Sequence, residues 1–132
     1  MRYQRNRIRH RIIPELETIN PNVVNTVVRL GNSVREDVIL ISQLTDTAFN
    51  ELVTISDEGA FISRRGLRKK PLAIQRRLWQ RLVSIFDPEI KLTTAHQEQL
   101  LDIVNTGEGK TFNIKSIKVS AQCDTIKVYC KH

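Results

Sequence analysis

Cysteine, glycine and histidine are scarce in this sequence, and each shortage argues against a class of protein. Two cysteines among 132 residues do not make a disulfide framework, so both are expected to be reduced, in a cytosol-like compartment. The five glycines never stand in a pair, so there is no Gly-rich phosphate loop. The three histidines are scattered, which argues against a metal centre. No apolar run approaches the ~18 residues of a membrane span.

Acidic residues are missing from two segments that are rich in basic ones. Residues 1–11 carry five basic side chains and no acid, and residues 64–81 carry eight basic side chains and no acid. Such segregation is typical of an electropositive surface that binds nucleic acid. A solvated basic face is the alternative for both segments. A membrane surface is disfavoured, because neither segment has an apolar face flanked by Trp and Phe.

The spacing of apolar residues predicts one long helix. From Val27 to Ile55 they recur at intervals of three or four residues, which is the helical signature. Asn20-Pro21 is a strong start for this helix, since Asn caps free N–H groups and Pro suits the first turn. Residues 56–59 are expected to end it. Part of its apolar face has no evident partner in the chain, so the helix is a candidate surface for pairing two copies.

Two shorter helices and a sheet are predicted to follow. The helix from Pro71 to Phe86 has an inward stripe (Ile74, Leu78, Leu82 and Ile85), with Trp79, Val83 and Phe86 beside it. Thr94 and Gln97 fit a capping box for a helix that Gly107 ends. Residues 112–128 then alternate with period two, with a turn at 122–125. The expected fold is α+β and mainly α, with a long N-terminal helical arm, a small helical domain and a short C-terminal antiparallel β-sheet.

The N-terminal segment carries a motif. Arg5-Asn6-x-Ile8-Arg9 is followed by Ile13-Pro14-x-Leu16 and then by Asn20-Pro21. Pro14 is expected to break or kink a helix here, because it lacks an N–H and its ring meets the preceding turn. The motif resembles the segment of tRNA(Ile)-lysidine synthetases that follows their ATP-binding catalytic domain. The resemblance continues weakly over the whole chain.

The resemblance implies an activity for the full family enzyme. It would use ATP, with magnesium, to adenylate the cytidine at the first anticodon position of an isoleucine tRNA, and free lysine would then displace AMP. The family's loop of the type Ser-Gly-Gly-x-Asp-Ser is absent here. The expectation is therefore a C-terminal portion that lacks the catalytic domain and is inactive alone. Residues 1–20 would form a basic linker helix, and residues 21–132 a helical tRNA-binding domain with C-terminal strands.

Candidate site residues come from two sources. The motif gives Arg5, Asn6 and Arg9, which would lie near the substrate cleft of the catalytic domain and contact ATP, lysine or RNA. Charge alone gives the basic run, predicted as one continuous RNA-binding surface with Gln80 on the same outer face. Its members are Arg64, Arg65, Arg68, Lys69, Lys70, Arg76, Arg77 and Arg81. The implied partners are tRNA(Ile) and the missing catalytic domain, with no cofactor or metal bound by this chain itself.

A stand-alone nucleic-acid-binding regulator or adaptor, without catalysis, is the competing hypothesis. No zinc finger, RNP string or leucine zipper supports it. The two shorter helices could imitate a helix-turn-helix, but residues 87–93 between them make too long a turn. The expected location is the cytoplasm, and the sequence also fits a plastid stroma.

Overall fold

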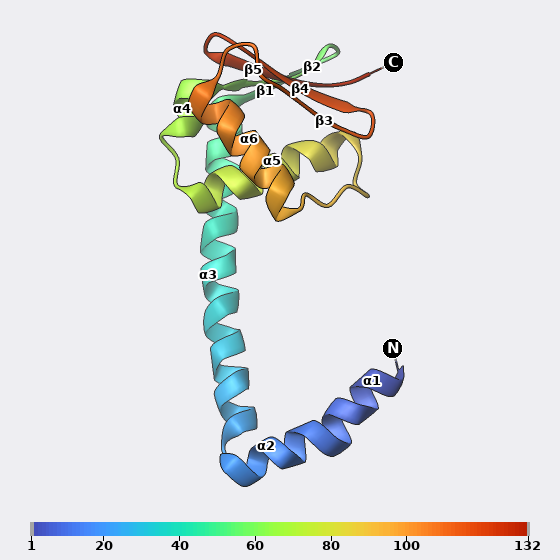
Figure 1. The fold of residues 1–132 in the computed structure, drawn as a ribbon. Helices are drawn as coiled ribbons and strands as arrows, with labels where there is room; N and C mark the ends of the chain where they lie inside the picture. Colours follow the sequence, from blue (N-terminus) through green and yellow to red (C-terminus); the bar gives the residue numbers. More distant parts are fainter. Residues whose placement is uncertain (1, 132) are drawn as a thin grey trace. The chain divides into compact units, whose positions relative to one another are not determined.

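The computed structural model describes residues 2–131, without the side chain of Arg2. The chain divides into two compact units, residues 1–40 and residues 41–132. The predicted α+β fold, mainly helical with an antiparallel sheet at the C-terminus, is confirmed (Figure 1). No helix of the described residues is long and apolar enough to cross a membrane. The same residues contain no cluster of His, Cys, Asp and Glu placed to hold a metal ion.

The first unit begins with a helix that changes its winding before Pro14 and does not stop there. Three segments follow one another without a gap: α1 (Arg2–Arg7), the π-helical η1 (Ile8–Ile12) and α2 (Ile13–Ile19). The N–H of Ile13 donates to the carbonyl of Ile8, five residues earlier. Pro14 lies in the first turn of α2, where its missing N–H is tolerated. Of the two expected outcomes, a break does not occur, and the helix is instead distorted locally into a π-helical turn directly before the proline.

Helix α3 (Val23–Leu52) is the predicted long helix. It begins at the predicted signal, where Asn20 Oδ1 accepts a hydrogen bond from the N–H of Asn22 at 3.0 Å. In the first unit the apolar side chains of α3 are exposed, with Val27 at 60% and Leu30 at 64%. In the second unit the same helix contributes buried residues, among them Ala48 at 2%.

The end of α3 differs from the prediction. Residues Val53–Ser56 are strand β1, which pairs antiparallel with β2 (Gly59–Ser63), so the helix does not reach Ile55. Residues 56–59 make the hairpin turn. Gly59 has φ +129°, and a Cβ there would collide with the carbonyl oxygen of Val128. The three β-branched residues that follow Leu52 favour a strand, and the cross-strand pairing outweighs the continuing helical spacing.

The hairpin joins a five-stranded sheet in the order β1-β2-β5-β4-β3. Its other strands are β3 (Thr111–Ile114), β4 (Ile117–Gln122) and β5 (Thr125–Cys130). The predicted alternation and the turn at 122–125 are confirmed, and inward-facing Val119 and Val128 are fully buried. Helices α4 (Arg64–Arg68), α5 (Leu72–Phe86) and α6 (Thr94–Thr106) lie on one side of the sheet (Figure 1).

The core of the second unit lies between these helices and the sheet. Leu78, Trp79 and Leu82 of α5 are fully buried, as predicted. The predicted stripe is wrong at its end, because Ile85 is 46% exposed. Val83 and Phe86, which were predicted beside the stripe, are fully and partly buried, so they complete the inward face in place of Ile85.

The capping box of α6 lies one residue earlier than predicted. Thr93 Oγ1 accepts from the N–H of His96 at 3.3 Å, and His96 Nδ1 accepts from the N–H of Thr93 at 3.2 Å. The imidazole takes the role that a Glu or Gln usually has, so Thr94 and Gln97 are not the pair. Gly107 ends the helix with φ +77°, as predicted.

Candidate nucleic-acid interface

The basic run begins on α4, a short helix fixed by its neighbours on both sides. Ser63 Oγ accepts a hydrogen bond from the N–H of Gly66 at 3.1 Å and so caps the helix. Leu67 is fully buried and anchors α4 in the core. With Leu67 turned inward, Arg65 and Arg68 are left exposed to solvent.

Three arginines of α4 line a hollow of about 410 Å³ together with residues of the β4–β5 turn. Its lining residues are Arg64, Arg65, Arg68, Cys123 and Asp124. The N–H of Arg65 donates to Asp124 Oδ1 at 2.9 Å, and the N–H of Arg64 donates to the carbonyl of Asp124 at 2.7 Å. These two bonds hold the turn against α4. The sequence predicted this turn but gave no sign that it faces the arginines, so Cys123 and Asp124 were missed.

Arg64 points inward and differs from its two neighbours. Its Nη1 donates to the carbonyl of Val104 at 3.5 Å, near the C-terminal end of α6. A guanidinium is favourable there, because the helix end carries partial negative charge. Gly107 makes room for it, since a Cβ at that position would collide with the guanidinium. Arg64 therefore ties α4 to α6, which leaves Arg65 and Arg68 as the outward groups of the hollow.

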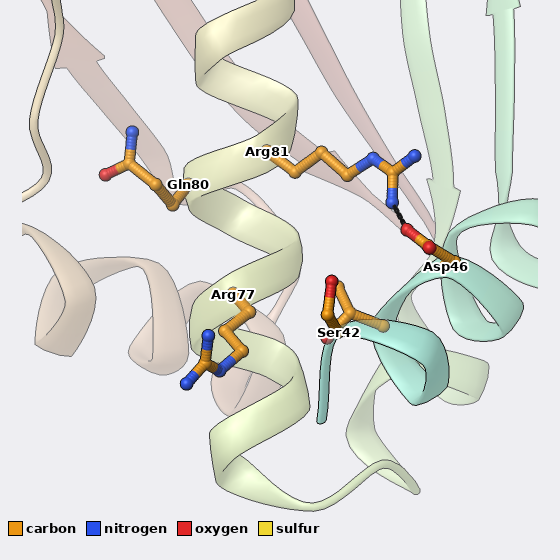
Figure 2. A pocket seen from close by; sticks show the side chains of 6 residues that line it. Ser42, Asp46, Arg77, Gln80 and Arg81 are labelled. Carbon is orange, nitrogen blue, oxygen red and sulfur yellow. Dashed lines mark hydrogen bonds and ion pairs between the residues drawn. The ribbon is translucent and has the colours of Figure 1, made fainter. Parts of the chain in front are cut away.

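Two members of the basic run pair with acids of α3. Lys70 Nζ lies 2.6 Å from Glu51 Oε2. Arg81 forms an ion pair with Asp46, drawn in Figure 2, and its guanidinium also lies over the ring of Phe49, 4.6 Å from the centroid. Both basic side chains are occupied by partners that come earlier in the chain.

Figure 2 shows the hollow of about 270 Å³ between α3 and α5, which Arg77, Gln80 and Arg81 line. Gln80 is half-buried rather than on the outer face as predicted. Its Nε2 donates to the carbonyl of Ile90 and its Oε1 accepts from the N–H of Leu92, each at 2.9 Å. Gln80 thus holds the loop between α5 and α6. In the same view Arg77 points away from Asp46.

Five basic residues of the run are exposed and take part in no ion pair among the described residues. We call them the open cations: Arg65, Arg68, Lys69, Arg76 and Arg77. Guanidinium and ammonium groups in this state are ready to bind oxyanions, and the arginines can do so with two parallel hydrogen bonds.

The motif residues of the first unit are exposed as well. Arg5 and Asn6 lie on α1 and Arg9 on η1. The structure brings two other arginines of this segment, Arg7 and Arg11, together in a hollow of about 270 Å³ that Glu15 also lines.

The first unit also contains a groove with no polar lining. We call it the aliphatic groove; its volume is about 290 Å³. It is lined by Ile8, Ile12, Ile13, Leu16, Val23, Val24, Val27 and Val28. Contiguous exposed apolar surface is a common feature of interaction sites.

One carboxyl group of the second unit has a shifted pKa. The pKa of Asp102 on α6 lies below its ordinary value of 3.8, because Lys110 donates a hydrogen bond to the carboxylate and adds a positive charge beside it. Asp102 is exposed, and its partner Lys110 lies just beyond α6. The pair stabilises the surface locally and adds no candidate acid or base to the interface.

Comparison with known proteins identifies relatives of one kind. No protein-family model matches the chain. It is 31% identical over 84 residues to a tRNA(Ile)-lysidine synthase of Geobacter sulfurreducens, a match that covers 63% of the chain and 18% of the relative. The synthases of Streptococcus gordonii and Clostridium perfringens are 30% and 26% identical over 79% and 85% of the chain. These matches span 22% and 24% of the two relatives.

These matches confirm the resemblance that the N-terminal motif indicated. The chain is similar to a part of tRNA(Ile)-lysidine synthases, whose name describes enzymes that modify a tRNA. It spans about a fifth to a quarter of the length of the curated relatives that it matches.

Proposed function

We propose that this chain is a tRNA-binding portion of a tRNA(Ile)-lysidine synthase. It positions tRNA(Ile) while a separate catalytic domain uses ATP, with magnesium, to join lysine to the first anticodon cytidine. The single observation that supports this role is the set of open cations. The choice of tRNA(Ile) as the substrate rests on the similarity to the named synthases.

The open cations bind the RNA backbone. Phosphate oxygens accept bidentate hydrogen bonds from Arg65 and Arg68 on one helix and from Arg76 and Arg77 on the next. Contacts of this type fix the position of an RNA and read its shape more than its sequence. Arg64, Lys70 and Arg81, which already have protein partners, serve the interface by holding α4 and α5 in place.

The first unit serves the junction with the catalytic domain. Arg5, Asn6 and Arg9 face the substrate cleft of that domain, where they contact ATP, lysine or RNA. The aliphatic groove packs against the same domain. Two facts support this occupant: the chain spans only part of the relatives' length, and the groove has no polar lining. The competing occupant of the groove is a second copy of the chain, paired through α3.

A salt-dependent titration tests the RNA-binding role. The full chain is titrated with unmodified tRNA(Ile) and with duplex DNA of equal length at several salt concentrations. We expect a preference for tRNA, and a log–log salt slope that falls by about 2 in the variant Arg76→Ala/Arg77→Ala, because each lost phosphate contact lowers it by about 1. Arg65→Ala/Arg68→Ala should behave alike.

The matched control is Arg29→Ala/Arg35→Ala, which removes the same charge from exposed positions of α3. It should leave the slope close to wild type. An unchanged affinity in both interface variants, with native circular dichroism, would overturn the assignment of the open cations. Equal and weak binding of tRNA and DNA would instead favour the stand-alone nucleic-acid-binding module.

A further inference from the structure

The sheet of the second unit has a second face, which the helices of residues 41–131 do not cover (Figure 1). Two aromatic side chains, Phe61 of β2 and Tyr129 of β5, stand on this face. Strand register places them: Phe61 is opposite Lys127, and Tyr129 follows Lys127 by two residues. The two rings are therefore diagonal neighbours on adjacent strands. Diagonal neighbours lie about 7–8 Å apart, a distance that aromatic side chains can bridge.

A lysine occupies the space between the rings. Lys127 Nζ lies 5.3 Å from the ring centroid of Phe61 and 5.3 Å from that of Tyr129. Its carboxylate partner Glu58 is 3.3 Å away, with 76% of its side chain exposed, so the ion pair is weak. A phosphate group that approaches this face would compete for Lys127 and draw the ammonium group off the rings. Both aromatic faces would then be free.

A hollow with several polar side chains in its lining adjoins Tyr129. It has a volume of about 420 Å³, within the range of sites for small organic groups. Its lining side chains include Thr111, Ser120 and Gln122, which offer hydroxyl and amide groups, and the cation of Lys118, which is cross-strand neighbour to Tyr129. Glu108 at the same hollow disfavours a phosphate there, so the hollow fits an uncharged base or sugar better than a backbone phosphate.

We infer that this sheet face binds single-stranded RNA by stacking unpaired bases on Phe61 and Tyr129. Lys127 and Lys118 neutralise the adjacent phosphates, and the hollow beside Tyr129 takes a base or sugar edge. Paired aromatic rings on neighbouring central strands, with lysines between them, suit unstacked bases because every base has a π-face to offer. The inference deepens the proposed function, since unpaired nucleotides of the bound tRNA would be the natural occupants.

A binding assay with a short oligonucleotide isolates this face. The full chain is titrated with a fluorescently labelled eight-nucleotide single-stranded RNA of mixed sequence. The test variant is Phe61→Leu/Tyr129→Leu, which keeps apolar bulk on the sheet but removes both rings. Since the variant loses both stacking platforms, we expect at least about a tenfold loss of affinity. Tyr3→Leu, at a position 93% exposed in the first unit, is the matched control and should bind like wild type.

Three outcomes have distinct meanings. Equal binding of the oligonucleotide by wild type and by the double variant overturns the stacking face, and leaves tRNA binding by the open cations intact. A wild-type chain that binds tRNA but not the oligonucleotide has the same meaning. A wild-type chain that binds neither RNA overturns the proposed function as well.

Photocrosslinking tests the same inference on the wild-type chain, so its result does not depend on whether the double variant folds. The wild-type chain is irradiated with the same oligonucleotide carrying 5-iodouridine, and the crosslinked peptide is identified by mass spectrometry. Attachment to Phe61 or Tyr129 supports the inference. Attachment confined to α4 and α5 overturns it.

Discussion

The two units differ in how far they bury apolar side chains that have the same helical spacing. Helix α3 shows this difference within one element, because it begins in the first unit and ends in the second. Its apolar residues recur with the same spacing from end to end. In the first unit Val27 and Leu30 are more than half exposed, whereas in the second unit Ala48 is buried. Periodicity therefore predicts that a helix forms and which face is apolar, but not whether that face is covered.

Hydrogen exchange should give the largest contrast between the units. Amides of α5 around Trp79 should exchange about a hundredfold or more slowly than those of α3 between residues 23 and 40. Local opening is easiest where few apolar contacts must break, and α5 lies in the core while this part of α3 is exposed. Exchange followed by mass spectrometry or NMR measures the ratio. Equal protection of amides along the whole of α3 would contradict the difference in packing between the two units.

The same substitution in the two units should have unequal cost. Leu78→Ala should destabilise the chain by about 2–5 kcal/mol, because it leaves a cavity in a fully buried position. Leu30→Ala, at a position 64% exposed, should change the stability by no more than about 0.5 kcal/mol. Urea unfolding of both variants gives the two values. A Leu78→Ala cost well below 1 kcal/mol would mean that this face of α5 is not core.

Glycine replacement should give the smallest effects, and they should be opposite in sign. Gly31→Ala in α3 should stabilise the helix by up to about 1 kcal/mol, since nothing lies within 4 Å of the added methyl group. Gly59→Ala should destabilise by about 1–3 kcal/mol, because the residue has φ +129° and its Cβ would collide with Val128. Thermal melts of the two variants measure both shifts. Equal shifts of the same sign would contradict the difference in packing.

The sequence predicted those parts of the fold that local chemistry decides. The predicted limits of α5, Pro71 and Phe86, agree with the observed helix to within one residue. The segments predicted from their period of two are strands β3, β4 and β5. The errors lie where pairing with a distant segment outweighs local preference. Val53 lies in a strand because it pairs with Ile62 across a hairpin. The spacing of apolar residues along one helix carries no information about such a pairing.

The candidate interface shows the same limit. The density of basic residues on α4 and α5 was evident in the sequence, but their partners were not. Glu51 and Asp46 neutralise Lys70 and Arg81 from 19 and 35 residues earlier in the chain. Phe61 and Tyr129 gave no signal, since each is a single aromatic in an ordinary strand and only the sheet register makes them neighbours. The roles of Arg5, Asn6 and Arg9 remain predictions.

The π-helical turn at Ile8–Ile12 takes up about one residue more than an α-helical turn would. Both kinds of turn complete one revolution of the helix, so the extra residue is absorbed within the turn and the arginines before it keep nearly the same orientation relative to α2. Deletion of a single residue from this turn would restore regular winding. Arg5 and Leu16 would then keep nearly the same relative orientation. This turn can therefore accommodate one residue more or less without unfolding the helix and without redirecting the charged side chains.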